Sequence, residues 1–307
     1  MNVVVMEGRL RFGERLVVSF HRTLRVPGQG GPYKLPPGLG LFAIKPIADG
    51  RFIVPVHSRE AVWIGFSAAP WKPNAVKVMA GGINAVSGLP DDGTALLQPQ
   101  NYMVCPDQPW LDGCNVGDGV VRQFVAMKLG LGYGLGANTA AGERGGLDIL
   151  GFEPRPGLFP DAPSPPPGPV RMHAPVTAVA GTHEMTVAAG GRVEQKLYPD
   201  RHGRDAWDEA SAMRARVTLV DARDWPALTG EPAPATPVDA AAYARAGLPW
   251  FALDDADDLS VASGSEVGPG TIEERDRARG QSEPEPPVEV DPRSITVIRR
   301  RGADPPE

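Results

Sequence analysis

The stretch that most clearly sets the fold is residues 75–86, which read AVKVMAGGINAV. Two short apolar runs flank the pair Gly81-Gly82. Paired glycines supply the positive φ angles that a tight two-residue hairpin turn requires. The stretch therefore predicts an antiparallel β-hairpin that turns at Gly81 and Gly82.

Other short apolar runs indicate further strands. Residues 9–26 read as strand, turn and strand, with Gly13 and Glu14 in the turn. The remaining predicted strands are rich in β-branched and aromatic residues and lie at 51–56, 61–66, 102–105, 120–127 and 215–220. The sequence therefore predicts a mainly β protein, an antiparallel β-sandwich or barrel-like fold with a few short helices.

Helices are expected in two places. Residues 224–228 suit a short helical turn. Residues 236–247 carry stronger signals, with Thr236 as the N-cap, Pro237 at the first helical position and Gly247 as the stop. The most clearly predicted helix therefore begins at Thr236.

Composition divides the chain into four parts. Residues 1–153 form a first β-rich domain. Residues 154–169 hold eight prolines, and such a composition removes ladder donors and predicts a linker or a surface crossover. Residues 170–253 form a second β-rich lobe, in which Gly190-Gly191 repeats the hairpin pattern. The two lobes are expected to pack together.

The fourth part, residues 254–307, is an acidic tail. It holds 14 acidic and 7 basic side chains, so its formal charge of −7 leaves residues 1–253 at about +1 within a total of −6. Few of its residues are apolar, and disorder is predicted for it. One run, residues 294–301, is apolar and then basic, and we expect it to join the edge of the core or to serve as a partner-binding peptide.

Charge and hydropathy disfavour two classes of partner. A body of near-neutral charge lacks the clustered basic face that nucleic-acid-binding proteins carry. No run approaches the roughly 20 apolar residues that a membrane-spanning helix needs. The first residues, MNVVVME, have no basic flank and too short an apolar run for a secretory signal. We therefore expect a soluble, cytoplasmic protein that binds neither nucleic acid nor membranes.

Metal-binding and redox patterns are weak. Cys105 and Cys114 lie nine positions apart, and a reduced pair is expected in the cytoplasm. The five histidines, at positions 21, 57, 173, 183 and 202, lack the spacing of zinc ligands. The sequence predicts neither a metal site nor a cofactor.

The turn at residues 107–113, DQPWLDG, is the strongest candidate for a binding site. It brings two carboxylates, an amide and a large aromatic ring beside a strand end, and the next strand adds an arginine and a glutamine. The candidate ligand-binding residues are Asp107, Gln108, Trp110, Asp112, Arg122 and Gln123. A structural interpretation competes with this one. In it the aspartates accept backbone N–H groups of the turn, Trp110 fills the core and Arg122 forms an ion pair.

A glycine-rich loop follows at residues 130–136, GLGYGLG. It lacks the glycine order of dinucleotide-binding loops and the lysine of a P-loop. We expect a mobile loop that contributes to a recognition surface or acts as a lid.

Catalysis has less support. A hydrolase with paired carboxylates would need Asp107 and Asp112 about 5 to 10 Å apart across a cleft, with Arg122 beside them. A thiol nucleophile would be Cys105 or Cys114 with a histidine as base, but buried cysteines are usually inert. Catalytic residues therefore stay unassigned.

Three segments resemble a family of uncharacterised, mostly bacterial proteins. They are QPWLDG at 108–113, RQFVAM at 122–127, and TPV at 236–238 followed by GLPWF at 247–251. The resemblance covers roughly residues 20–255. It implies no activity and no catalytic residues, because none is established for the family.

The leading hypothesis is a non-catalytic binding or protein-interaction module that uses the 107–113 turn and the 130–136 loop, with a protein as its partner. One alternative is a hydrolase-like enzyme that acts through Asp107, Asp112 and Arg122. Another is a structural subunit of a homo-oligomer or larger assembly. The sequence does not identify the ligand.

Overall fold

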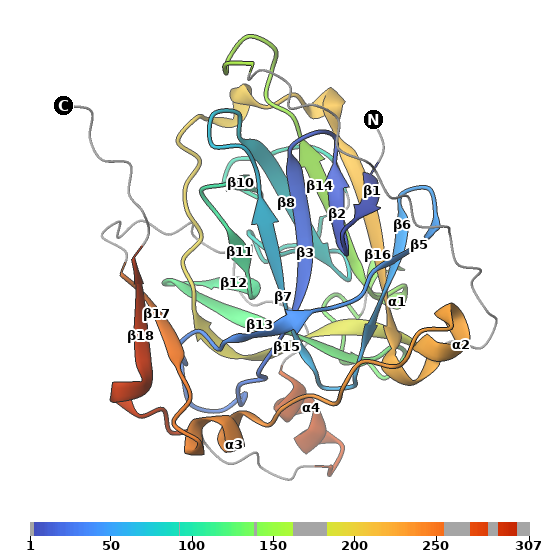
Figure 1. The fold of residues 1–307 in the computed structure, drawn as a ribbon, viewed down its shortest axis with the longest axis vertical. Helices are drawn as coiled ribbons and strands as arrows, with labels where there is room; N and C mark the ends of the chain where they lie inside the picture. The colour runs from blue at the N-terminus through green and yellow to red at the C-terminus, as the bar shows by residue number, and fades with distance from the viewer. Residues whose placement is uncertain are drawn as a thin grey trace.

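The computed structural model describes residues 3–91, 93–137, 140–161, 183–254, 271–281 and 288–299. Sixteen strands in these ranges form one large, curved and mainly antiparallel sheet (Figure 1). Its strands are β1 (Val3–Met6), β2 (Arg9–Phe12), β3 (Leu16–Thr23), β4 (Gly38–Leu41), β5 (Lys45–Ala48), β6 (Arg51–Val56), β7 (Ala61–Ser67), β8 (Asn74–Ala80), β9 (Ile83–Asn84), β10 (Met103–Cys105), β11 (Trp110–Leu111), β12 (Gly113–Gly117), β13 (Val120–Lys128), β14 (Leu147–Phe152), β15 (Glu184–Glu194) and β16 (Met213–Asp221). The prediction of a mainly antiparallel β protein is confirmed.

The hairpin at residues 75–86 is present. Strands β8 and β9 pair antiparallel with Ala80 opposite Ile83. Gly81 and Gly82 have φ angles of 55° and 82°, so both turn residues adopt the positive φ that glycine permits. The N-terminal hairpin is also present, with β2 and β3 paired antiparallel.

The strands do not divide at the predicted linker. The main path through the sheet runs β1-β2-β3-β7-β13-β15-β16-β14-β8-β10, so β15 and β16 lie between strands of the predicted first domain. One large core joins both ranges, with Phe20, Ile149, Val187 and Val217 among its members. The predicted second lobe therefore completes the first sheet. In the described part of the chain this sheet does not close into a barrel, since its path ends at β1 and β10.

The second Gly-Gly pair does not form a turn. Gly190 and Gly191 lie within the continuous strand β15, where they form a bulge opposite Gln123 of β13. A Cβ at position 191 would lie 2.1 Å from the carbonyl oxygen of Pro27. Glycine is therefore needed here because the backbones of β15 and Pro27 lie close together. The predicted hairpin at Gly190 and Gly191 is wrong.

The proline-rich segment is described only up to residue 161. Pro154 forms an isolated bridge with Trp207, which extends the sheet contacts beyond β14. The other predicted linker residues, 162–169, lie outside the described residues.

The helices are short. They are α1 (Ala140–Glu143), α2 (Trp225–Thr229), α3 (Ala240–Arg245) and α4 (Ile272–Ala278). Helix α3 begins later than predicted, because Asp239 and not Thr236 caps it by accepting the N–H of Ala242 at 2.7 Å. None of the described helices is long and apolar enough to cross a membrane.

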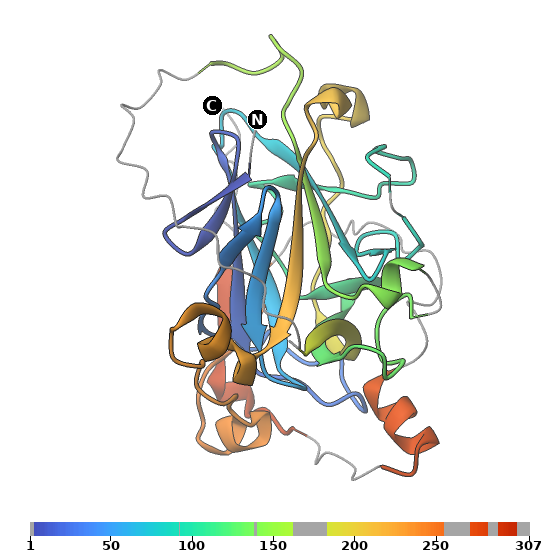
Figure 2. The same cartoon turned by 90° about the vertical axis from the view of Figure 1, so that its right-hand side faces the viewer.

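Parts of the predicted acidic tail pack on the body. Helix α4 carries a capping box between Thr271 and Glu274, and Ile272 is buried in a cluster with strand residues. Strand β18 (Ile295–Arg299) pairs in parallel with β17 (Trp250–Asp254) in a small separate sheet. Helices α3 and α4 lie at the same end of the molecule in both views (Figure 1, Figure 2). The prediction of disorder is therefore wrong for residues 271–281. The run at 294–301 was expected as an edge strand or a partner-binding peptide, and its described part forms β18 beside β17, not at the edge of the large sheet. Residues 255–270, 282–287 and 300–307 of the tail lie outside the described residues.

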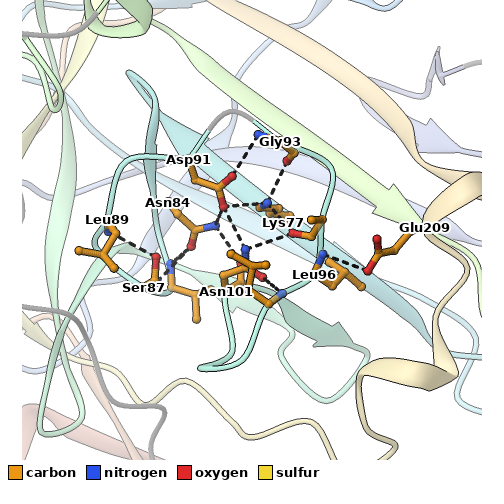
Figure 3. Close-up of polar contacts among 12 residues, drawn as sticks. Lys77, Asn84, Ser87, Leu89, Asp91, Gly93, Leu96, Asn101 and Glu209 are labelled. Atoms are coloured by element: carbon orange, nitrogen blue, oxygen red, sulfur yellow. Dashed lines mark hydrogen bonds and ion pairs between the residues drawn. The ribbon is translucent and has the colours of Figure 1, made fainter.

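A buried lysine organises the loop that follows β9. Lys77 of β8 is fully buried and lies 2.7 Å from the Asp91 carboxylate (Figure 3). Its Nζ also donates to the carbonyl oxygens of Gly93 and Ala95, each at 2.9 Å. All three protons of the ammonium therefore have acceptors, and the loop is fixed to the sheet.

Candidate functional site

A small apolar pocket lies beside the predicted 107–113 turn. Its volume is about 230 Å³. Five separate parts of the chain line it, namely the segment around β4, β7, the turn itself, β17 and β18. The lining residues are Leu35, Pro36, Gly38, Trp63, Trp110, Asp112, Phe251 and Ile298.

The sheet register explains why two tryptophans meet here. In the pairing of β3 with β7, His21 lies opposite Trp63. In the pairing of β11 with β7, Trp110 lies opposite Gly65. Side chains alternate between the two faces of a sheet, so Trp63, Gly65 and Trp110 share one face. Asp112 lies two residues beyond Trp110 and lines the same pocket.

Trp63 is held in place from behind. The His21 ring stacks on it with centroids 3.7 Å apart and an interplanar angle of 7°. His21 in turn lies 2.8 Å from the Ser19 hydroxyl, through Nε2. A Cβ at Gly65 would approach Ser19 Oγ to 2.6 Å, so glycine leaves room for this arrangement. The wall that Trp63 provides is therefore preformed.

The His21 side chain that stacks on Trp63 is uncharged at neutral pH. Burial, with the positive charge of Arg9 as a second cause, lowers the pKa of His21 to about 4. Above this pH the imidazole carries no charge, and its stacking on Trp63 places no cation behind the pocket.

Asp112 is the one carboxylate in the pocket wall, and it is 3% exposed. Its backbone is fully used, since its N–H donates to Gln195 Oε1 at 2.8 Å and its carbonyl accepts the N–H of Phe124 at 2.9 Å. Its side-chain Oδ2 is buried and has no hydrogen-bond partner among the described residues. Burial raises the pKa of Asp112 to about 7, against the opposing effect of a hydrogen bond from the Trp110 side chain.

The structure brings two of the six predicted binding residues, Trp110 and Asp112, to this pocket. Gln108 and Gln123 are structural instead. The amide of Gln108 donates to the carbonyl of Trp110 at 3.0 Å and accepts the N–H of Tyr198 at 3.1 Å. The amide of Gln123 donates to the carbonyl of Leu24 at 2.8 Å and accepts the N–H of Val26 at 3.0 Å.

Asp107 and Arg122 do not join the pocket. Asp107 is partly exposed and is absent from the lining residues. Arg122 lies opposite Cys114 in the pairing of β12 with β13, and its buried Nη1 has no hydrogen-bond partner in the part of the chain that the structure describes. The side chains of Arg122 and Asp112 therefore do not pair. The predicted grouping of two carboxylates and an arginine is not seen at this cavity.

The second half of the glycine-rich loop at 130–136 is buried, whereas Leu131 is 45% exposed. Tyr133 and Leu135 are buried, and the Tyr133 hydroxyl donates to Asp276 of α4 at 2.6 Å. The Arg279 guanidinium lies over the Tyr133 ring at 4.6 Å. These contacts fix the loop beneath α4. Tyr133 and Leu135 are therefore not accessible to a ligand as long as α4 stays in place.

Four residues of the pocket wall were not predicted from the sequence, namely Trp63, Phe251, Leu35 and Ile298. One signal was present for Trp63, because Val62, Ile64 and Phe66 alternate as core positions and leave Trp63 on the opposite face. Phe251 reaches the pocket because its N–H and carbonyl pair with Leu35 across the chain. This pairing is nonlocal and has no sequence signature.

Two larger cavities differ from this pocket in their charged groups. One, of about 350 Å³, is lined in part by Glu194, which pairs with Lys34 at 2.6 Å. The other, of about 310 Å³, is lined in part by Glu60, which pairs with Arg22 at 2.6 Å. Glu194 and Glu60 each pair with a cation, whereas Asp112 forms no ion pair with a described residue.

Two further kinds of chemical group in the described ranges are the cysteine thiols and the side chains that could bind a metal ion. Cys105 and Cys114 are free and buried, and burial raises the pKa of both thiols well above the usual range. Such thiols are poor nucleophiles. The described residues hold no group of three or more His, Cys, Asp or Glu side chains that could bind a metal ion. His173 lies outside the described residues.

Comparison of the chain with protein-family models, curated proteins and solved structures gives no match. The motif resemblance to uncharacterised bacterial proteins therefore stays a prediction. The case for function consequently depends on the pocket itself.

Proposed function

We propose that the protein is a non-catalytic binding module that captures a side chain of a protein partner in the pocket beside the 107–113 turn. One observation carries this proposal: five separate segments build an apolar cavity with three aromatic side chains, Trp63, Trp110 and Phe251, in its wall. Concave apolar sites with a few placed polar groups are the usual form of binding sites.

The size of the cavity favours one side chain over a larger ligand. Its volume of about 230 Å³ lies below the range of roughly 300–1,000 Å³ that drug-sized ligands occupy. A single inserted side chain that is surrounded by aromatic residues is also the usual anchor of a protein interface.

The C-terminal strand supports a macromolecular partner. Ile298 of β18 lines the pocket and is itself 38% exposed. An exposed apolar strand residue next to an anchoring pocket extends the contact surface beyond the cavity.

The hydrolase alternative has less support. It needs a second carboxylate or a nucleophile at the cavity, and the lining residues include only Asp112 as a titratable group. General acid-base chemistry requires such groups within hydrogen-bond reach of one another.

The test is partner capture from the cells that produce the protein, with the full chain and its Trp110→Ala variant. Trp71→Ala is the matched control, because Trp71 is 50% exposed and lies outside the pocket. We expect partners that bind the unchanged chain and the Trp71→Ala variant and are lost from Trp110→Ala. An identical set of proteins on all three, or none on any, contradicts the proposal.

A further inference from the structure

We propose that the pocket binds an alkylammonium group, and that its occupant is a lysine side chain of the partner. This inference rests on the proposed function and adds the chemical class of the ligand. It follows from the walls of the pocket, from the unpaired carboxylate and from the number of acceptor atoms that a ligand can reach.

The walls favour a cation over an anion. Three aromatic side chains, Trp63, Trp110 and Phe251, line a cavity of about 230 Å³. The negative face of an aromatic ring attracts an ammonium group, and tryptophan does so most strongly. The aliphatic part of a lysine side chain would at the same time contact the apolar residues Leu35, Pro36 and Ile298.

The carboxylate lacks a cation of its own. The Asp112 side chain is nine-tenths or more buried, and it makes no ion pair with a described Lys, Arg or His within 4 Å. Its Oδ2 accepts no hydrogen bond from the described part of the chain. A buried charge without a partner is unfavourable, and a ligand cation would remove this penalty.

The number of acceptors that a ligand can reach favours lysine over arginine. Oδ2 of Asp112 is buried, so a ligand in the pocket can reach at most the other oxygen of this carboxylate. A guanidinium binds a carboxylate best through two parallel hydrogen bonds, which need both oxygens. An ammonium group is a compact point charge and is satisfied by one oxygen and the ring faces.

The test compares three peptides on the full chain by nuclear magnetic resonance. They are acetyl-Ala-Lys-Ala-amide, the same peptide with arginine, and the same peptide with norleucine, which has a similar apolar chain and no charge. The indole N–H signals of Trp63 and Trp110 report binding and are assigned with Trp63→Phe and Trp110→Phe. The signal of the exposed Trp71 is the internal control.

We expect the lysine peptide to shift both pocket signals and to bind at least about tenfold tighter than either other peptide, as a hydrogen bond to a charged group implies. Asp112→Asn should remove this preference while the protein stays folded. If Asp112→Asn does not fold, the comparison of the three peptides on the unchanged chain decides alone.

Three results overturn the inference in distinguishable ways. Binding of the norleucine or arginine peptide as tight as that of the lysine peptide rejects an ammonium ligand and leaves the binding pocket in place. A lysine preference that survives in folded Asp112→Asn rejects the role of the carboxylate. No shift with any peptide rejects the inference and also counts against the proposed pocket.

Discussion

Lys77 and Asp112 are both buried charged groups on the sheet, and they differ in how fully they are satisfied. Lys77 has an ion pair with Asp91 and two carbonyl acceptors (Figure 3). Asp112 has one buried oxygen without a partner in the described structure and lies in the wall of an apolar pocket. A satisfied buried charge fixes a fold, whereas an unsatisfied one beside a cavity points to a missing ligand.

The largest effect is expected at Lys77. Lys77→Met should lower the free energy of unfolding by about 3–5 kcal/mol, because it leaves the Asp91 carboxylate and two carbonyl groups without their cation. Urea unfolding measures this change. The control is Lys34→Met, since the partly exposed pair of Lys34 with Glu194 should contribute about 1 kcal/mol or less. Equal losses of stability in Lys77→Met and Lys34→Met would contradict the view that the buried lysine contributes more to stability than the partly exposed one.

The next effect is expected at Asp112 and has the opposite sign, because removal of this charge should raise the free energy of unfolding. The pKa of Asp112 is raised from 3.8 to about 7, so between these values the folded state binds more protons than the unfolded state. The contribution of Asp112 to stability therefore falls as the pH rises from about 4 to about 7, by up to about 4 kcal/mol in total. His21, whose pKa is about 4, does not titrate in the upper part of this range.

Asp112→Asn should remove this loss. At pH 8 the variant is expected to be more stable than the unchanged chain, and the difference should shrink toward pH 4. Thermal or urea unfolding of both proteins across this pH range tests the point. A variant that is less stable at pH 8 would mean that Asp112 is satisfied in the fold, as Lys77 is.

A smaller effect is expected at Asn84, which extends the Lys77 network. Its amide donates to Asp91 at 3.0 Å and to the carbonyl of Asn101 at 2.8 Å, and its Oδ1 accepts the N–H of Val86 at 2.9 Å. Asn84→Ala should lower the free energy of unfolding by about 1–3 kcal/mol. It should leave the peptide binding of the Asp112 pocket unchanged, and a loss of that binding would show that the two regions are coupled.

The smallest effect concerns the remaining hydrogen bond of Asp112. The hydrogen bond from the Trp110 side chain favours the ionised carboxylate, so Trp110→Phe should raise the pKa of Asp112 further. Each pH unit of this rise corresponds to about 1.4 kcal/mol. The carboxyl carbon signal of Asp112, followed by nuclear magnetic resonance, measures the shift. A lowered pKa would contradict the assigned geometry.

Local signals predicted much of the fold. Gly81-Gly82 lies between two apolar runs and turns as expected. The same dipeptide at Gly190-Gly191 does not turn, because the approach of Pro27 to β15 is a tertiary contact. The prediction of disorder considered only composition, so it did not include helix α4, which begins with a capping box of Thr271 and Glu274.

The candidate site was predictable only in part. Trp110 and Asp112 stood out because they lie close together in a turn. The opposite walls, Trp63, Phe251 and Ile298, come from distant parts of the chain through strand pairing. Sequence spacing carries no information about such pairing, so the pocket could not be assembled from the sequence.

The most direct test of the account is the pKa of Asp112 in the full chain, measured from its carboxyl carbon signal with and without acetyl-Ala-Lys-Ala-amide. The signal is assigned by its loss in Asp112→Asn. We predict a pKa of about 7 in the free protein and a value at least about one pH unit lower with the peptide bound, because a cation favours the ionised carboxylate. A pKa near 4 in the free protein, or no change at saturating peptide, would contradict the account.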